Sequence, residues 1–344
     1  MTLFKFLNII LLSVFLIGCG SNSDQKSKDF SLQTNAQKKV INNSLELILS
    51  INNKKGHTID SVVYSLNGKQ IEATHSLESA KLGKNLIQAT VFFNGEFQYL
   101  SETISILNGT LPKVYQFTLL NEYPHDISSY TQGLEFYNGE LYESTGQYGQ
   151  SKLRKVNYKT GEVLKNVDLS PNFFGEGLSI LNDNIYQLTW QQKVGFVYDV
   201  NTLEKKSTFK YNQSKEGWGL CNDGQMLYKS DGTENIWLLD PVTLEEKGNI
   251  QAYTNKGKII GLNELEWIDG KIYANRYQKN GVAIINPNNG AIEGVIDFSS
   301  LRKKVKQHPD LDVLNGIAFN PETETIFVTG KNWDKLFEVK IDLQ

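Results

Sequence analysis

The sequence predicts an all-β protein, a five-bladed β-propeller preceded by a small β-sandwich. The chain has 16 tyrosines and 17 phenylalanines among its 344 residues, and aromatic side chains favour strands. A short motif recurs at intervals of 44, 42, 45 and 52 residues, a period typical of four-stranded propeller blades. The last repeat lacks a fourth strand, and an apolar segment before the first repeat can supply it by pairing the two ends of the domain.

Residues 1–19 resemble a bacterial lipoprotein signal peptide with its lipobox. Lys5 precedes an apolar run that ends in Leu16-Ile17-Gly18-Cys19. The run is shorter than the roughly 20 residues that span a bilayer, so a transmembrane helix is the weaker interpretation. We therefore expect Cys19 to be lipidated and to anchor the protein to a membrane of the bacterial cell envelope, on the periplasmic side or at the cell surface.

Two further segments precede the repeats. Residues 20–43 are largely polar, which predicts a flexible tether. Residues 44–110 contain short alternating apolar runs, with Asn67-Gly68 and Asn94-Gly95 as hairpin turns between them. This pattern predicts a small, immunoglobulin-like sandwich that carries no catalytic group of its own.

Residues 111–344 hold the repeats, and one position at the start of each repeat varies in a way that indicates chemistry. That position reads Gln132, Glu176, Trp218, Asn263 and Asn315. The first strand of each blade runs along the central channel of a propeller, so these side chains should ring one mouth of it. Second strands return to the same mouth and bring Trp190, Asp231, Tyr277 and Lys331 close behind. Glu176 is the single carboxylate at the variable position.

Composition argues against several other functions. The net charge is −3 and the sequence has no basic run, so it lacks the clustered positive charge that binds the phosphates of nucleic acid. The two cysteines provide no disulfide framework, because Cys19 belongs to the lipobox. Four histidines lie scattered without the spacing of metal ligands, so we expect neither a metal nor a cofactor. We also expect a monomer.

Seven motifs, taken in order, resemble the plant and bacterial type of glutaminyl-peptide cyclotransferase. They cover the repeats from end to end but not residues 1 to about 110. The motifs are Tyr130–Leu134, Glu143–Gly149, Phe174–Leu178, Gly217–Leu220, Leu262–Glu266, Leu314–Ala318 and Val328–Lys331. One position departs from the family pattern, since Asn-x-Trp-Gln appears here as Asn275-Arg276-Tyr277-Gln278.

The resemblance implies an acyltransferase that converts the N-terminal glutamine of peptides or proteins to pyroglutamate and releases ammonia. It places the catalytic carboxylate on Glu176, which we expect to act as general acid and base. Asn263 and Lys331 are expected to stabilise the developing oxyanion. The expected substrate-binding residues are Tyr130, Gln132, Phe174, Trp190, Trp218 and Tyr277.

Two alternatives stay open. The first is a lipoprotein whose propeller only binds a ligand or another protein, which would explain the anchor and the fold but not a lone glutamate among aromatic and amide groups. The second is a metal-dependent propeller hydrolase or lactonase. That enzyme would need several carboxylates or histidines around one ion, whereas the channel mouth offers only Glu176 with Asp231 nearby. His125, in Pro124-His125-Asp126, precedes the first repeat, and we expect a structural role for it.

Overall fold

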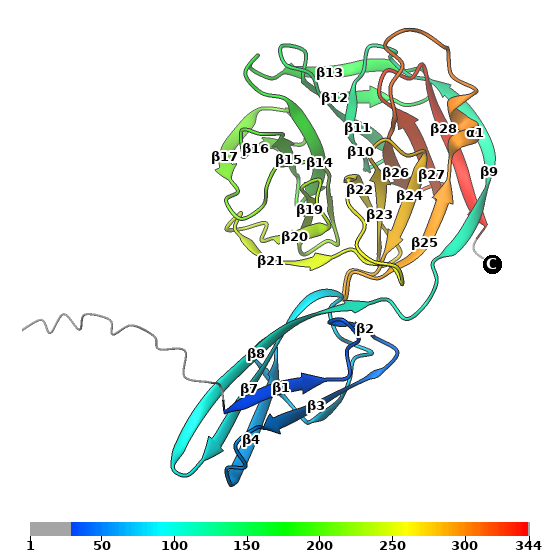
Figure 1. Cartoon of the computed structure of the whole chain (residues 1–344). Helices are drawn as coiled ribbons and strands as arrows, with labels where there is room; N and C mark the ends of the chain where they lie inside the picture. Colours follow the sequence, from blue (N-terminus) through cyan, green and yellow to red (C-terminus); the bar gives the residue numbers. More distant parts are fainter. Residues whose placement is uncertain (1–28, 343–344) are drawn as a thin grey trace, which may run out of the picture.

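A computed structural model describes residues 29–342 and shows an all-β molecule in two parts (Figure 1). The all-β prediction is therefore confirmed. Among the described residues one short helix is assigned, α1 (Ser299–Arg302). The predicted signal peptide, the lipidation site Cys19 and residues 20–28 of the predicted tether lie outside the described residues. Within residues 29–342, no helix has the length and apolar character needed to cross a membrane.

The N-terminal part consists of two sheets that share one core. The first sheet has the order β1 (Phe30–Thr34), β3 (Glu46–Asn53), β6 (Thr74–Ser76). The second has the order β2 (Val40–Asn42), β8 (Glu96–Leu107), β7 (Gly83–Phe93), β4 (Ile59–Leu66), β5 (Lys69–Ile71). Side chains from both sheets, including Leu47, Ile87 and Ile104, meet in one buried cluster.

The predicted tether is wrong in its C-terminal half, because strands begin at Phe30 rather than after residue 43. β1 pairs with β3 in antiparallel register, from Phe30 opposite Asn53 to Thr34 opposite Leu49. The Phe30 side chain is fully buried and packs against the ring of Phe93. A five-residue strand with one buried aromatic residue is too short a signal to stand out in a polar segment.

The larger part contains consecutive groups of strands, most of them four-stranded antiparallel sheets. Three sheets follow chain order: β10 (Thr131–Tyr137), β11 (Glu140–Thr145), β12 (Lys152–Asn157), β13 (Glu162–Asp168); β14 (Gly175–Leu181), β15 (Asn184–Thr189), β16 (Val194–Asp199), β17 (Lys205–Lys210); and β18 (Leu220–Asn222), β19 (Leu227–Ser230), β20 (Asn235–Leu239), β21 (Glu246–Gln251). The remaining strands form an eight-stranded sheet: β22 (Leu262–Ile268), β23 (Lys271–Arg276), β24 (Gly281–Ile285), β25 (Ile292–Asp297), β9 (Lys113–Pro124), β28 (Lys335–Asp342), β27 (Thr325–Gly330), β26 (Leu314–Asn320).

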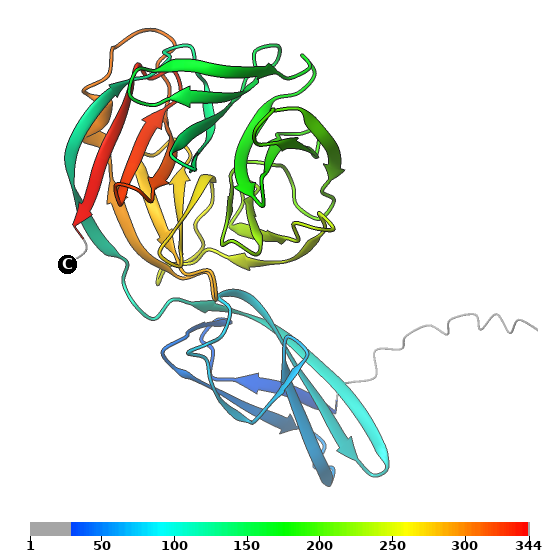
Figure 2. The ribbon, with the colours of Figure 1, turned by 180° about the vertical axis from the view of Figure 1, so that it is seen from behind.

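The first strands of these groups contact one another in a closed ring. β10 contacts β14 and β26, β14 contacts β18, β18 contacts β22, and β22 contacts β26. Figure 1 and Figure 2, from opposite sides, show the groups arranged around this common centre. Every residue of β14, the first strand of its sheet, is buried. By contrast β13, the last strand of the preceding sheet, is almost wholly exposed. Burial therefore falls from the ring outward.

Glycines that follow the variable position let the first strands approach so closely. A Cβ atom on Gly133 would lie 2.5 Å from the backbone nitrogen of Leu178, and one on Gly219 would lie 1.9 Å from the carbonyl oxygen of Asn263. The same position in the second repeat, Gly177, donates its N–H to the carbonyl of Trp218 at 2.6 Å. Backbone packed against backbone leaves no room for a side chain here.

The ring closes through β9, as the sequence predicts. β9 pairs antiparallel with β28 over most of its length, with Phe117 opposite Ile341 and Pro124 opposite Lys335. It also pairs briefly in parallel with β25. The strand that the last group lacks in sequence order is thus supplied from before the first group.

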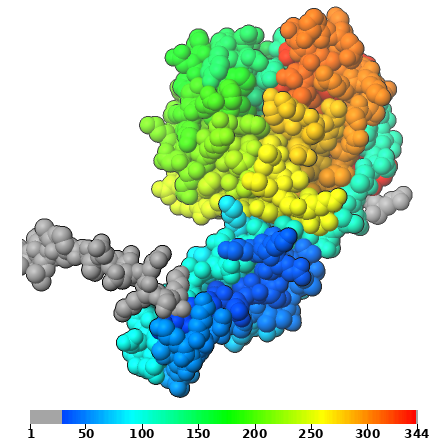
Figure 3. Space-filling view, in the orientation of Figure 1, coloured from blue at the N-terminus to red at the C-terminus, as the bar shows by residue number. Residues whose placement is uncertain are grey.

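The two parts touch along a mixed apolar and hydrogen-bonded contact. Tyr253 and Ala291 of the larger part belong to the buried cluster of the N-terminal part. The backbone N–H of Leu82 donates to the carbonyl of Asn289 at 2.8 Å, and that of Lys84 donates to Oε1 of Gln251 at 2.8 Å. In Figure 3 the blue and cyan N-terminal part abuts the yellow segment of the larger part at this contact.

Candidate active site

A cavity of about 230 Å³ lies where the first strands begin and the second strands end. It is lined by nine residues: Tyr130, Gln132, Phe174, Glu176, Trp190, Trp218, Asn263, Tyr277 and Lys331. They are the same nine residues that the sequence analysis predicts as catalytic or substrate-binding. The structure therefore brings the whole predicted set around one cavity, although their roles stay predictions.

The polar residues on the first strands lie in β-bulges. Thr131 and Gly133 pair with Thr145 and Ser144, which leaves Gln132 as an extra residue in its strand. The register shifts in the same way around the other variable positions: between Gly175 and Leu178, between Leu262 and Leu265, and between Leu314 and Ile317. A bulge bends its strand and re-aims the extra side chain, and here it falls at four of the five variable positions.

Glu176 is a buried carboxyl group without a polar partner. The residue is only 4% exposed, and no other described side chain forms a hydrogen bond or ion pair with its carboxyl oxygens. Burial raises the pKa of Glu176 well above its usual range, and the negative charge of Glu216 adds to the rise. The ammonium of Lys331 acts in the opposite direction but does not cancel the effect of burial.

Lys331 is the cation of the cavity. Its ammonium lies 4.6 Å from the ring centroid of Tyr130 and 5.4 Å from that of Tyr277, in cation–π contact with both. Burial lowers the pKa of Lys331, while the nearby carboxylates of Glu176 and Asp312 oppose that change. The cavity thus joins an acid and a base whose charged forms are both penalised by burial.

Two amide side chains complete the polar lining. The Oε1 atom of Gln132 accepts a hydrogen bond from Nδ2 of Asn315 at 2.9 Å, so its NH₂ group is the end left to serve as a donor. Asn263 is 2% exposed, and its Oδ1 atom has no hydrogen-bond partner within the described part of the chain. A buried amide without a partner is costly, and a ligand in the cavity can supply one.

Aromatic rings form the remaining walls. Phe174 contacts Trp190 at a centroid distance of 5.5 Å and Tyr130 at 6.1 Å, edge to face. On another wall Trp218 contacts Tyr277 at 5.6 Å. Such walls lower the local dielectric and leave a few placed polar groups to orient a small polar ligand.

Comparisons with known proteins agree with this geometry. The sequence profile described as glutamine cyclotransferase matches residues 96–341. A glutaminyl-peptide cyclotransferase of Arabidopsis thaliana is 38% identical over 232 residues, which cover 67% of this chain and 72% of the plant protein. The chain belongs to the glutamine cyclotransferase family.

A solved structure supports the same assignment. The crystal structure of Myxococcus xanthus glutaminyl cyclase superposes with a TM-score of 0.63 at 35% identity, covering 67% of this chain and 98% of that protein. The resemblance found in the sequence is confirmed, and with it the prediction of an enzyme of the acyltransferase class.

Glu216 is the residue of this glutamine cyclotransferase that sequence reasoning missed. Its Oε2 atom accepts hydrogen bonds from the indole nitrogens of Trp190 at 2.7 Å and Trp218 at 2.8 Å. One carboxylate therefore fixes two walls of the cavity. Glu216 precedes β18 in an irregular segment, where no periodic pattern predicts the direction of a side chain.

A buried lysine supports the segment that carries Glu216. The ammonium of Lys229 donates to the carbonyl of Glu216 at 2.9 Å and to Oγ of Ser214 at 2.5 Å, and lies 3.4 Å from the carboxylate of Glu246. Burial lowers its pKa to about 8. Lys229 acts on the cavity only through this backbone contact.

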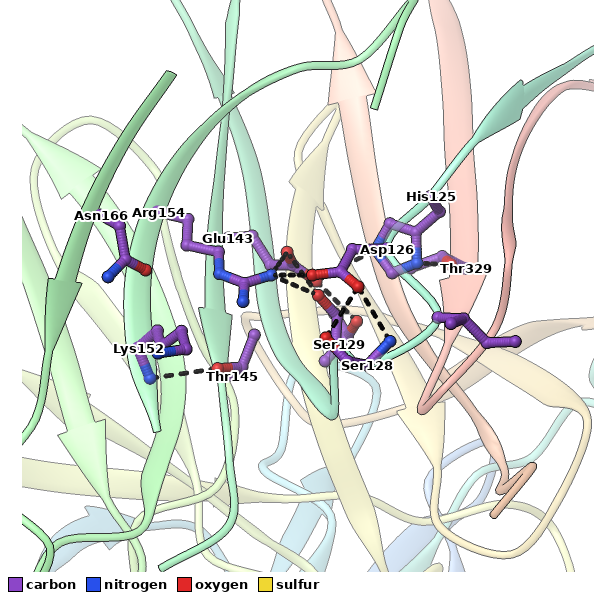
Figure 4. Close-up of polar contacts among 12 residues, drawn as sticks. His125, Asp126, Ser128, Ser129, Glu143, Thr145, Lys152, Arg154, Asn166 and Thr329 are labelled. Carbon is purple, nitrogen blue, oxygen red and sulfur yellow. Dashed lines mark hydrogen bonds and ion pairs between the residues drawn. The ribbon is translucent and has the colours of Figure 1, made fainter. Parts of the chain in front are cut away.

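Two other candidates from the sequence lie outside the cavity. Asp231 is buried, but its Oδ2 atom accepts from the indole nitrogen of Trp237 at 2.8 Å, so it holds its own loop. His125 contacts the carboxylate of Glu143 at 3.0 Å (Figure 4) and the carbonyl of Trp333 at 2.8 Å. The structural role expected for His125 agrees with these contacts.

Across residues 29–342, no three or more histidine, cysteine, aspartate or glutamate side chains are grouped so that they could hold a metal ion. Cys221, the cysteine in this range, is free and buried.

Proposed function

We propose that this chain is a glutaminyl-peptide cyclotransferase that converts an N-terminal glutamine to pyroglutamate, with Glu176 as general acid and base. The observation that supports this role most directly is the state of Glu176, a buried carboxyl group with raised pKa and no internal partner. Catalytic carboxyl groups need a pKa near the working pH, and burial is the usual means of raising it.

The raised pKa suits the first proton transfer. A peptide amine arrives largely as an ammonium ion, with a usual pKa of about 7.7–8.0. Next to a carboxylate whose proton affinity is raised by burial, the proton moves from the ammonium to Glu176. The free amine can then attack the side-chain amide carbon of the same residue. Holding the glutamine curled within the cavity makes this attack intramolecular and removes most of its entropic cost.

The second transfer returns the proton to the leaving group. Attack forms the ring C–N bond and an oxyanion on the former amide oxygen. Lys331 supplies positive charge for that oxyanion, and the free NH₂ of Gln132 and the amide of Asn263 supply hydrogen bonds. Glu176 gives its proton to the departing nitrogen and then takes the extra proton from the ring nitrogen, so that the ring becomes a neutral lactam. The oxyanion re-forms the carbonyl as the C–N bond to the departing nitrogen breaks, and ammonia leaves. The aromatic walls exclude water, which would otherwise convert the side chain to glutamate.

Mass spectrometry of a reacted peptide tests the activity. The full chain is incubated with a peptide that begins with glutamine, and with a control peptide that begins with asparagine and is otherwise identical. We expect the glutamine peptide to lose one ammonia and the asparagine peptide to persist. A product in which water has replaced the ammonia would identify a hydrolase, and an unchanged glutamine peptide would contradict the proposed function.

The architecture of the enzyme also enters the proposal at its finer level. The closed ring of five first strands supports a five-bladed propeller for residues 111–344, closed by β9 pairing with β28. Two sheets around one core support a small sandwich as the N-terminal domain. The N-terminal glutamine of a peptide or protein is the proposed substrate, and the proposed enzyme is a monomer.

Lipidation of Cys19 remains a proposal based on the lipobox. It would place the enzyme on the envelope of a bacterial cell, tethered to a membrane. In Cys19→Ser the sulfur that accepts the lipid is absent, so we expect the protein to leave the membrane fraction. A Ser variant that sediments with membranes as the parent does would contradict the anchor.

A further inference from the structure

A second, larger cavity adjoins the catalytic one. This cleft has a volume of about 870 Å³ and is lined by Ile127, Ser128, Tyr130, Thr145, Gly146, Gln147, Gly149, Gln150, Lys152, Arg154, His308, Asp310 and Asn332. Tyr130 lines both the cleft and the catalytic cavity. The mechanism proposed above uses no other residue of the cleft.

Gly146 forms part of the thin wall between the two cavities. A Cβ atom at this position would lie 2.3 Å from the ring of Phe174 and 3.1 Å from Cγ of Gln132, both of which line the catalytic cavity. The N–H of Gly146 donates to the carbonyl of Tyr130 at 2.8 Å. The loop that borders the cleft therefore lies with its backbone directly against the catalytic side chains.

The loop is held in one conformation. Gln147 has a φ of 85°, in the left-handed region that non-glycine residues rarely adopt. Its carbonyl accepts a hydrogen bond from the Ser151 hydroxyl at 2.8 Å, and the Oγ atom of Ser151 in turn accepts from the N–H of Gly175 at 2.9 Å. Gly175 precedes Glu176, so the loop and the catalytic strand share one set of contacts. Strained backbone of this kind is found disproportionately at ligand sites.

The volumes of the two cavities indicate which part of a peptide substrate each one can hold. The catalytic cavity, at about 230 Å³, has room for little more than one residue. The reacting amine and the side-chain amide both belong to the N-terminal glutamine, so the rest of the peptide continues from its main-chain carbonyl and must leave at the rim. A cleft of about 870 Å³ is within the size range of sites for larger ligands and adjoins that rim at Tyr130.

Most of the cleft lining suits a peptide main chain: of its lysine, arginine and aspartate side chains, Asp310 alone has no ion pair within residues 29–342. Arg154 is paired with Asp126 at 2.8 Å (Figure 4). Lys152 is paired with Asp168, so both cations are already neutralised. Gln150 is exposed, and its side-chain amide forms no hydrogen bond with any residue in 29–342. Amide groups can pair with the N–H and C=O groups of any peptide.

We propose that the cleft binds the second and third residues of a substrate whose N-terminal glutamine occupies the catalytic cavity. The substrate class is then peptides and protein N-termini of at least three residues, rather than glutamine amides or dipeptides. This inference rests on the proposed cyclotransferase function. The cleft adds affinity through the main chain, so the sequence that follows the glutamine matters less than its length.

Substrate length provides the test. Initial rates of ammonia release are measured for glutaminamide and for glutamine followed by one, two or three alanines, each ending in an amide. We expect kcat/KM to rise on the order of tenfold from the first to the last, the effect of one or two added hydrogen bonds. The gain should level off after the third residue.

Variants of Gln150 locate the effect. Gln150→Trp fills the cleft, and Gln225→Trp makes the same change at an exposed glutamine in the turn between β18 and β19. The ratio of kcat/KM for the longest substrate to that for glutaminamide should fall to near one in Gln150→Trp and should stay at the parental value in Gln225→Trp. Gln150→Ala, which adds no bulk, should lower the ratio about threefold by loss of one hydrogen bond.

The outcomes separate the two proposals. Turnover of all substrates with no length dependence, or a ratio that Gln150→Trp and Gln150→Ala leave unchanged, would overturn the cleft assignment while the cyclotransferase function stands. No turnover of glutaminamide or of any longer substrate would instead contradict the function itself.

Discussion

Two buried carboxyl groups of this enzyme, Glu143 and Glu176, lie in neighbouring strand groups and behave in opposite ways. Glu143 accepts hydrogen bonds from Thr131 at 2.7 Å and Ser129 at 3.2 Å and contacts His125 at 3.0 Å (Figure 4). Its pKa lies below the usual range because these partners and Arg154 outweigh burial. Glu176 is equally buried but has no such partners, so its pKa is raised.

The difference provides a way to test which of the two buried acids takes part in the proposed chemistry. Burial alone penalises the charged form of both groups. Glu143 joins a network that ties the segment before β10 to β11 and to Arg154, and a fully paired charge of this kind stabilises the fold only as long as its partners remain. Glu176 keeps its hydrogen-bonding capacity free for a ligand. Whether a buried acid has internal hydrogen-bond partners is therefore a better guide to its function than its burial.

The largest expected effect is the loss of turnover in Glu176→Gln. Glutamine keeps the volume of the side chain but cannot transfer a proton, a role that typically contributes about 10² to 10⁴ in rate. Because the carboxyl group has no internal partner, the thermal midpoint should stay the same or rise. The checks are kcat for pyroglutamate formation and calorimetry. Near-parental turnover of Glu176→Gln, or its failure to fold, would mean that Glu176 is a structural acid like Glu143.

The converse result is expected for Glu143→Gln. This change leaves the charges of His125 and Arg154 without their buried partner, which typically costs about 3–5 kcal/mol. For a protein of this size that lowers the thermal midpoint on the order of 10 °C. At temperatures where the variant remains folded, kcat should stay within about threefold of the parent, since no proton transfer is lost. A loss of kcat like that of Glu176→Gln, in folded protein, would place Glu143 in the chemistry.

A smaller effect is expected for Glu216→Gln, which tests how a neighbouring charge sets the pKa of Glu176. Removal of this negative charge should lower the pKa of Glu176 and shift the corresponding limb of the kcat/KM profile to lower pH, by less than about one unit. Tryptophan emission should change as well, because both Trp190 and Trp218 donate to this carboxylate. Glu245→Gln is the matched control, at an exposed glutamate paired only with Lys247. An unshifted profile with changed emission would limit Glu216 to holding the indoles.

The smallest effects concern the pH dependence of stability, and the two acids should differ in sign. The folded-state pKa of Glu176 lies above the ordinary value of 4.5, so its contribution is present below about pH 4.5 and is lost as pH rises through the folded value. The folded-state pKa of Glu143 lies below 4.5, so its contribution is present above about pH 4.5 and is lost as pH falls through the folded value.

Thermal midpoints across a pH series measure these contributions. Between about pH 5 and 8 the midpoint of Glu176→Gln should rise relative to that of the parent, by about 2–4 °C for each kcal/mol. The deficit of Glu143→Gln should shrink as the pH falls below about 4.5, where the parental carboxylate becomes protonated. Parallel curves for both variants would mean that the two acids titrate alike, against the contrast drawn here.

The amino-acid sequence determined the parts of this protein that are repeated or local. The recurring openings located the first strands of the repeats. Asn67-Gly68 and Asn94-Gly95 located two hairpins, and the unpaired segment before the first repeat identified β9 as the closing strand. Because each repeat places its variable residue at the same mouth, seven of the nine cavity residues followed from the repeat, whereas Tyr130 and Phe174 followed from the family resemblance.

Only the tertiary structure decided the details that depend on irregular backbone or on residues far apart in the chain. The bulge at Gln132, which leaves Thr131 opposite Thr145 and Gly133 opposite Ser144, is one such detail, because a single inserted residue leaves no periodic signal. The double hydrogen bond of Glu216 joins side chains from two strand groups through a segment without regular structure. Glu143 and Glu176 look alike in sequence, both being acids in buried strands. Their difference in pKa arises from partners such as His125 and Ser129, and contacts of that kind exist only once the chain has folded.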